Sequence, residues 1–189
     1  MKMSSLQELL VAQLKDLYSA ENQLVKALPK MAKNVTSDAL REAIENHLEE
    51  TRGQVERLQK IGEMLDAKLT GHKCVGMEGL IEEGAEVLEE DGPEAILDAA
   101  VVAAAQRVEH YEMAGYGTAR TMAELLGQQE VVELLQQTLD EEKAADQKLT
   151  QVVESEIYPQ AAASAEAWAE ENGGGRAKRG GRTKAGSSR

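Results

Sequence analysis

The chain has 189 residues, a net charge of −13, 42% hydrophobic residues and 3% aromatic residues. This length suits one substantial domain and is short for two. Phenylalanine is absent and the apolar residues are mainly Leu, Ala, Val and Met, which favours a helical bundle over a β-sandwich.

The expected cellular location and the domain boundary follow from simpler sequence patterns. No run of about 18 uninterrupted apolar residues occurs, the N-terminus MKMSSLQELL lacks the apolar centre of a signal peptide, and Cys74 is the single cysteine. We therefore expect a cytoplasmic protein with no membrane partner. Residues 173–189 carry six Lys and Arg and no acid, so we expect a disordered basic tail after a domain that spans residues 1–172.

Four long helices are predicted along the domain. The first begins at Ser5, where Ser5-Leu6-Gln7-Glu8 fits a capping box, and the second follows a turn near residues 34–37 and ends at about Ala67. A connection of about 25 residues comes next and contains a short helix at 77–90. The third helix begins at Pro93 and runs to about 126, and the fourth spans about 129–157. Pro159 should end or kink it, and residues 161–172 could form a last short helix that packs Trp168.

The loop lengths predict the topology. Short loops make antiparallel neighbours, so the helices form two hairpins, and the long connection allows the second and third helices to run parallel. One long crossover between two hairpins is the ferritin-like arrangement of a four-helix bundle. We place the core of this all-α bundle at about residues 4–157.

Polar residues interrupt the apolar face of each long helix near its middle. Reflecting each hairpin about its turn places Glu21 opposite Glu50, and Glu112 opposite Glu142. The polar residues of the four helices therefore fall at one height. The predicted cluster comprises Glu21, His47, Glu50, Glu109, Glu112, Glu142 and Asp146.

Such a cluster needs positive charge at its centre. A buried unpaired carboxylate costs several kcal/mol, and facing carboxylates raise each other's pKa. One or two divalent iron or manganese ions bridged by carboxylates would offset this cost in a ferritin-like bundle. Shared protons would be the alternative.

Several stretches also resemble a known family. LYSAENQLVKALPKMAK, HLEETRGQVERLQKIGEML, KCVGMEGLIEEG, RVEHYEMAGYGTARTMAELLG and LLQQTLDEEKAADQKLTQV are similar to the YciE/YciF family of bacterial, stress-associated, ferritin-like proteins of undefined activity. The resemblance implies a four-helix domain, usually a homodimer, with metal ligands in the bundle centre. The matching ligand positions are Glu21, Glu50 with His47 or Gln54, Glu109, Glu112, Glu142 and Asp146.

Two departures from the di-iron pattern bear on the chemistry. That pattern has Glu-x-x-His on two helices, whereas the second helix has the reversed order His47-x-x-Glu50, and Ala145 stands three residues after Glu142. A site rich in carboxylates and poor in histidine favours hard ions such as manganese.

Other conspicuous residues have simpler interpretations. His110 should face a flank of the bundle, and His72 with Cys74 should lie in an ordinary loop with a reduced thiol. Tyr18 and Tyr111 could approach the cluster, although packing is the expected role of both.

The leading hypothesis is a stress-response protein that binds iron or manganese and oxidises ferrous ions with peroxide or dioxygen. The alternative is a non-enzymatic structural or interaction protein in which the carboxylates share protons or pair with Arg120 or Lys143. In either case nucleic acid could bind only through the basic tail.

Overall fold

The computed structural model describes residues 3–164 and confirms an all-α ferritin-like bundle. The predicted basic tail and Trp168 lie outside the described residues. Within these residues, no helix is long and apolar enough to cross a membrane. The helices are α1 (Leu6–Asn34), α2 (Asp38–Met64), α3 (Val75–Val87), α4 (Glu94–Leu125), α5 (Gln129–Val152) and a π-helical turn at Val153–Ile157.

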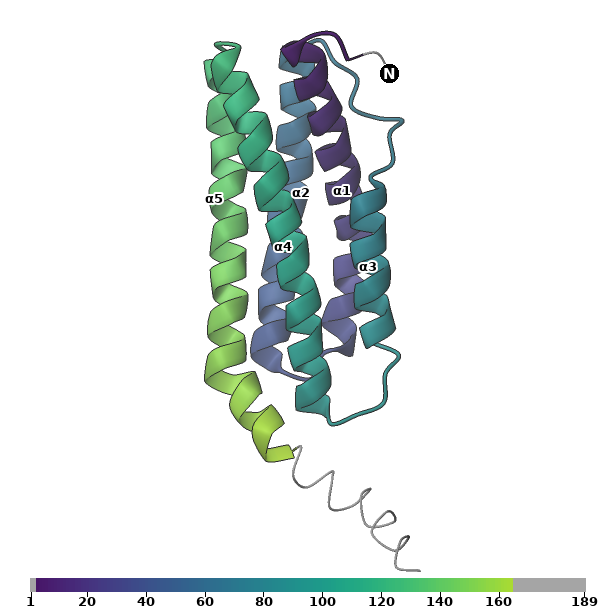
Figure 1. Cartoon of the computed structure of the whole chain (residues 1–189). Coiled ribbons are helices and arrows are strands. Elements are labelled where there is room, and N and C mark those ends of the chain that lie inside the picture. Colours follow the sequence, from purple (N-terminus) through teal and green to yellow (C-terminus); the bar gives the residue numbers. More distant parts are fainter. Residues whose placement is uncertain (1–2, 165–189) are drawn as a thin grey trace, which may run out of the picture.

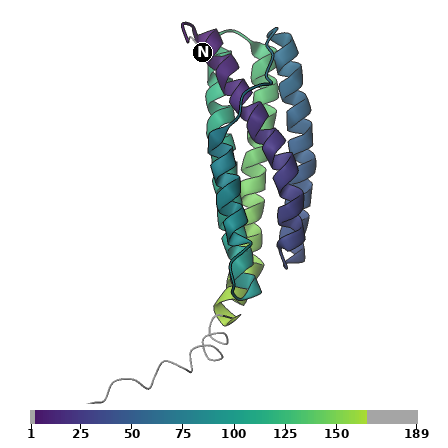
Figure 2. The same ribbon diagram turned by 90° about the vertical axis from the view of Figure 1, so that its right-hand side faces the viewer.

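The four long helices form two antiparallel hairpins (Figure 1). Helices α1 and α2 make one hairpin, and α4 and α5 make the other; α2 also contacts α5, and α1 contacts α4. The crossover from α2 to α4 runs the length of the bundle, so these two helices point the same way, as predicted (Figures 1 and 2). Helix α3 lies within this crossover and packs against α1 and α4.

The starts of α1 and α2 follow from side-chain caps. The hydroxyl of Ser5 accepts a hydrogen bond from the backbone N–H of Glu8 (3.1 Å), and the carboxylate of Glu8 accepts one from the N–H of Ser4 (2.6 Å). The hydroxyl of Ser37 accepts in the same way from the N–H of Leu40 (3.2 Å). Each cap satisfies backbone donors that the helix leaves free, and stabilises it by about 1 kcal/mol.

Three predicted helix boundaries shift by a few residues. Helix α2 ends at Met64, because Asp66 adopts a left-handed backbone (φ 47°) that the helix cannot continue. Helix α3 begins at Val75, because the Cys74 thiol caps it by accepting from the N–H of Met77 (3.3 Å). Pro93 is the N-cap of α4 and not its first residue.

The end of α5 differs from the prediction that Pro159 ends or kinks it there. The chain stays helical through Pro159 to Ser164, and the irregularity lies one turn earlier, in the π-helical turn Val153–Ile157. A proline lacks an N–H and clashes with the carbonyl four residues before it. That carbonyl belongs to Ser155, within the π-helical turn, which absorbs the mismatch. The chain turns away from the axis of α5 at this point (Figure 1).

The hydrophobic core consists of two clusters, one toward each end of the bundle. On α1, Leu10, Leu14 and Leu17 belong to one cluster, whereas Leu24 and Leu28 belong to the other. The same division occurs on α2, α4 and α5. Between the two clusters lies a layer of buried polar residues: Glu21, His47, Thr51, Gln54, Glu109, Glu112 and Glu142.

A buried carboxylate outside this layer, that of Asp98, holds the α1–α2 turn. Asp98 of α4 is 3% exposed and accepts hydrogen bonds from the N–H of Thr36 (3.0 Å), the hydroxyl of Thr36 (2.7 Å) and the N–H of Ser37 (2.7 Å). We expect Asp98→Ala to lower the free energy of unfolding by about 2 kcal/mol, because three hydrogen-bond donors of the turn lose their carboxylate acceptor. Urea denaturation beside the exposed control Glu86→Ala checks this; equal stability of the two variants would contradict it.

Candidate metal centre

The polar layer brings five predicted ligands into the bundle interior. Glu21, Glu112 and Glu142 are 0% exposed, and Glu109 and His47 are 2% and 7% exposed. One ligand atom from each of His47, Glu109, Glu112 and Glu142 lies within 4.8 Å of the others. Four side chains from α2, α4 and α5 therefore converge on one small volume.

Glu21 joins this group from α1 through a tyrosine that the sequence analysis did not select. The hydroxyl of Tyr116, a fully buried side chain, donates a hydrogen bond to the Glu21 carboxylate. Tyr116 follows Glu112 by four residues, so helical spacing places both on one face of α4, and that spacing was the available signal.

The two tyrosines that were considered lie elsewhere. The hydroxyl of Tyr18 accepts from the Gln59 amide (3.0 Å) near the surface, and that of Tyr111 donates to Asp16 (2.5 Å). Both therefore have structural contacts away from the carboxylate layer.

Two of the predicted ligands lie at the margin of the buried group. The Glu50 side chain is 45% exposed, and its carboxylate lies 3.7 Å from Nδ1 of His47. Asp146 accepts a hydrogen bond from the Gln106 amide (3.1 Å) and lies 3.6 Å from His110, whose exposed ring is on the flank. Metal ligation by any of the seven residues stays a prediction.

The buried layer is short of hydrogen-bond partners. Among the described residues, nine buried side-chain nitrogen or oxygen atoms have none. They belong to Glu21, His47, Gln54, Glu109, Glu112 and Glu142, and both oxygens of Glu112 and Glu142 are included. Buried polar groups are nearly always satisfied, and each exception costs about 1–3 kcal/mol. Such a concentration in one layer is what a group of side chains that could hold a metal ion would leave without the ion.

The lysine and arginine side chains of the described residues do not neutralise the cluster. In the described part of the chain, Arg120 pairs with Glu124 (3.4 Å) and Lys143 with Asp140 (3.4 Å). A half-buried pair, Arg57 with Glu141 (2.9 Å), lies beside the layer, where Glu141 also accepts from the Gln54 amide (3.2 Å). That bond fixes Gln54 while its own oxygen stays unpaired.

Burial and mutual repulsion raise the pKa of the glutamates. Burial is the largest cause, and it raises the pKa of Glu21 and of Glu109 to about 8 and those of Glu112 and Glu142 well above the usual range. The pKa of His47 is also raised: burial lowers it, but the nearby carboxylates, Glu50 first, favour the imidazolium form. Near neutral pH, the glutamates of the metal-free centre therefore hold protons.

Proton release should accompany metal binding. At pH 6.5, below their pKa of about 8, Glu21 and Glu109 are mostly protonated, and a metal ion binds carboxylates only after the protons leave. We expect about two or more protons to be released per chain at pH 6.5 and fewer at pH 9.5, where Glu21 and Glu109 are already ionised. Calorimetric Mn²⁺ titration in two buffers of different ionisation enthalpy measures the number, and equal heats in both buffers would refute the prediction.

The donor set fits a hard divalent ion. It offers carboxylate oxygens and one imidazole and no thiolate, which is the chemistry that iron(II) and manganese(II) accept. One ligand atom from each of His47, Glu109, Glu112 and Glu142 lies within 4.8 Å of the others. All four residues, and Glu21, have at least one unpaired buried atom. A group of buried His and Glu side chains that could hold a metal ion is thus present.

A separate polar network surrounds Cys74, at the base of α3. The carboxylate of Asp16 accepts from the Cys74 thiol (3.2 Å) and from the Tyr111 hydroxyl and lies 3.0 Å from Nε2 of His72. Burial raises the pKa of the Cys74 thiol. These contacts join the crossover to α1 and α4, which supports the structural interpretation of the residues His72 and Cys74.

Fold and site together define the class of the protein: an all-α bundle of ferritin-like topology with a buried carboxylate and histidine cluster. The model of the family described as "Domain of unknown function (DUF892)" matches residues 5–162, and the chain belongs to that family. It is 46% identical over 162 residues to Protein YciF of Escherichia coli (strain K12), with 85% of this chain and 98% of the relative covered. The family resemblance predicted from the sequence is confirmed.

Solved structures of relatives share the fold. The crystal structure of the E. coli stress protein YciF is 48% identical with a TM-score of 0.77, and YcfI from Rhodopseudomonas palustris is 44% identical with a TM-score of 0.76; each comparison covers 79% of this chain and 95% of the other. A protein from Xanthomonas campestris pv. campestris, at 24% identity and a TM-score of 0.69 over 87% of this chain and 99% of the other, shows the fold alone.

Proposed function

We propose that this chain is a stress-response protein that binds one or two iron or manganese ions in its carboxylate layer and oxidises ferrous ions with peroxide or dioxygen. The stress association rests on the relative that is called a stress protein in E. coli. The observation that carries the metal site is the set of unpaired buried atoms on Glu21, His47, Glu109, Glu112 and Glu142.

Charge balance supports up to two divalent ions. Four buried glutamates, Glu21, Glu109, Glu112 and Glu142, carry four negative charges when ionised. Two divalent cations neutralise them while His47 stays uncharged, and no other cation of the described residues reaches the cluster. Glu50 and Asp146, at the margin, would join as additional ligands or orient the others.

The metal ion and the residues of the carboxylate layer would have separate roles in this reaction. A bound iron or manganese ion supplies the one-electron chemistry. When peroxide is reduced by two ferrous ions, the O–O bond breaks and two protons are taken up to form two waters. These two protons would come from solvent, because Glu21 and Glu109 release theirs when the metal ion binds. Tyr116 holds the Glu21 carboxylate in place through its hydroxyl.

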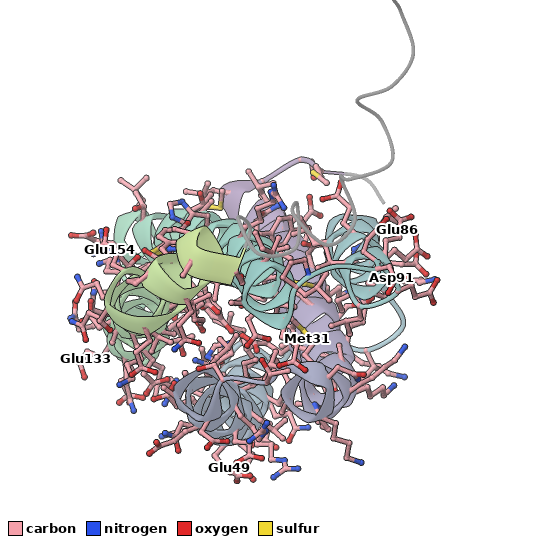
Figure 3. All side chains as sticks on the ribbon, turned by 90° about the horizontal axis from the view of Figure 1, so that it is seen from below. Met31, Glu49, Glu86, Asp91, Glu133 and Glu154 are labelled. Carbon is pink, nitrogen blue, oxygen red and sulfur yellow. The ribbon has the colours of Figure 1, made fainter. Side chains whose placement is uncertain are left out.

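Anaerobic reconstitution followed by peroxide tests the proposal. The protein is loaded with ferrous ions, desalted and analysed for iron, and then titrated with peroxide while ferric absorbance and peroxide consumption are followed. We expect one or two retained ions per chain, and two ferrous ions oxidised per peroxide consumed. Glu142→Gln should abolish both, whereas Glu133→Gln on the same helix, whose side chain points outward, should change neither (Figure 3).

The two parts of the proposal fail separately. Absence of retained metal after this reconstitution and after a parallel loading with Mn²⁺ would refute the metal site and favour the structural alternative. Retained metal without peroxide consumption, or consumption that Glu142→Gln leaves unchanged, would refute the oxidation and leave metal binding standing.

A further inference from the structure

A pocket connects the carboxylate layer with the surface between α2 and α5. It has a volume of about 290 Å³ and is lined by residues of α1, α2, α4 and α5. Its inner end is formed by the buried side chains of His47 and Glu109, and its rim by the exposed residues Asn46, Glu50, Ala144 and Lys148. A molecule in this pocket would therefore lie against the candidate metal centre.

The walls between these two ends are apolar. Leu28 and Met31 of α1, Ile44 of α2 and Leu149 of α5 line the pocket, and Met31 points toward the bundle interior in the axial view (Figure 3). Pockets of this kind, apolar with a few polar groups at defined points, are typical of sites for small organic molecules. A ferrous ion or peroxide alone requires no such hydrocarbon surface.

Small side chains create the pocket, and one of them stands at an informative position. Ala145 lies three residues after Glu142, where the di-iron pattern has the histidine of Glu-x-x-His, and Ala145 lines the pocket. Ala43, Ala105 and Ala144 also line it. A histidine at position 145 of α5 would fill part of this pocket. With alanine there, that space belongs to the pocket that leads to the candidate metal centre.

The rim supplies hydrogen-bond donors for a polar end group. Lys148 and Asn46 are exposed there, and Lys148 forms no ion pair with another described residue. The carboxylate of Glu50, at the same rim, lies 3.7 Å from Nδ1 of His47. Its partner of opposite charge therefore lies on the inner side, toward the carboxylate layer. An anionic end group is therefore matched by Lys148 and Asn46.

We propose that this pocket binds a small organic acid, with its carboxylate at Lys148 and Asn46 and its hydrocarbon end beside His47 and Glu109. The volume holds about ten non-hydrogen atoms, on a scale of about 30 Å³ for each water-sized group. The proposal gives the centre an organic substrate class; that substrate role rests on the proposed metal function, whereas binding in the pocket does not.

Octanoate, which has this size, is the probe. Isothermal titration calorimetry of octanoate into the metal-free full-length protein should give one site per chain. Ala145→Leu, which fills the pocket, should weaken binding about tenfold or more. Lys148→Met, which removes the rim cation without touching the interior, should weaken it about threefold. The matched controls are Ala103→Leu, at an exposed position of α4, and Lys143→Met, which is exposed on α5 and pairs with Asp140; neither should change the affinity.

Loading the protein with Mn²⁺ then tests where the hydrocarbon end of octanoate lies. In Mn²⁺-loaded protein, the terminal methyl protons of octanoate should relax faster than the protons next to its carboxylate. No saturable binding to the metal-free protein, or equal affinities for Ala145→Leu and Ala103→Leu, would overturn the pocket assignment. Faster relaxation at the carboxylate end would overturn the orientation. Octanoate binding without metal retention would support the pocket and refute the metal function. Metal retention without octanoate binding would support the metal function and refute the pocket.

Discussion

Glu112→Met is expected to stabilise the metal-free protein by about 1–4 kcal/mol and to weaken metal binding severely. Both carboxyl oxygens of Glu112 are buried and without a hydrogen-bond partner, and its pKa is raised well above the usual range. A methionine of similar volume removes two unsatisfied polar atoms and a carboxyl group that repels Glu21, Glu142 and Glu109. Replacing buried charged groups with apolar ones of similar shape often gains stability of this size.

Chemical denaturation of the metal-free proteins checks the prediction. Glu124→Met on the same helix is the control, since Glu124 is exposed and its ion pair among the described residues is with Arg120; it should change stability by about 0.5 kcal/mol or less. A Glu112→Met protein that is less stable than the parent would show that the Glu112 carboxyl has a stabilising partner in the fold. That result would count against a functional role of the polar layer.

Saturating Mn²⁺ is expected to stabilise the parent protein strongly and in a pH-dependent way. A ligand that binds only the folded state adds about 2.7 kcal/mol at a free concentration one hundred times its Kd, and two ions would add about twice that. Protons compete with the ion below the raised pKa values of Glu21 and Glu109, about 8, so the stabilisation should be larger at pH 8 than at pH 5.5.

Thermal unfolding with and without Mn²⁺ at the two pH values measures this effect. In Glu112→Met, the increase in stability on adding Mn²⁺ should largely disappear at both pH values. A stabilisation that is equal at pH 5.5 and pH 8, or that survives in Glu112→Met, would place the ion on surface carboxylates and not in the buried layer.

The height of the polar layer was predictable because it depends on two simple regularities. Helical spacing puts Glu21, Glu109 and Glu142 on inward faces, and reflecting a hairpin about its turn sets which residues face one another. The structure agrees: the two hydrophobic clusters meet at this layer, with Leu17 on one side of Glu21 and Leu24 on the other. The long crossover likewise followed from loop length.

Side-chain direction was not predictable in the same way. Glu50 and Asp146 have the right height, but Glu50 reaches the surface and Asp146 turns toward Gln106. Helical spacing assigns a residue to a face within a broad angle, and local partners decide where its carboxylate ends. The same limit hid the bond from Tyr116 to Glu21, which joins α4 to α1.

The irregular end of α5 also lay beyond the sequence pattern. Pro159 correctly indicated a disturbance, but its effect moved one turn upstream into Val153–Ile157, where packing of Val153 and Ile157 in the core keeps the chain helical. Tertiary contacts overrode the local preference of the proline. The pocket was hidden for a similar reason, since it depends on Ala145 and on residues of three other helices at once.

Anomalous diffraction from crystals grown with Mn²⁺ tests the central claim most directly. We predict one or two manganese peaks in the buried layer, within coordination distance of Glu109, Glu112, Glu142 and His47, and with Glu21 on the α1 side. The peaks should be missing in Glu142→Gln crystals grown in the same way. Peaks confined to surface carboxylates, with the layer closed by hydrogen bonds between protonated glutamates, would contradict the metal site and leave a proton-sharing structural cluster.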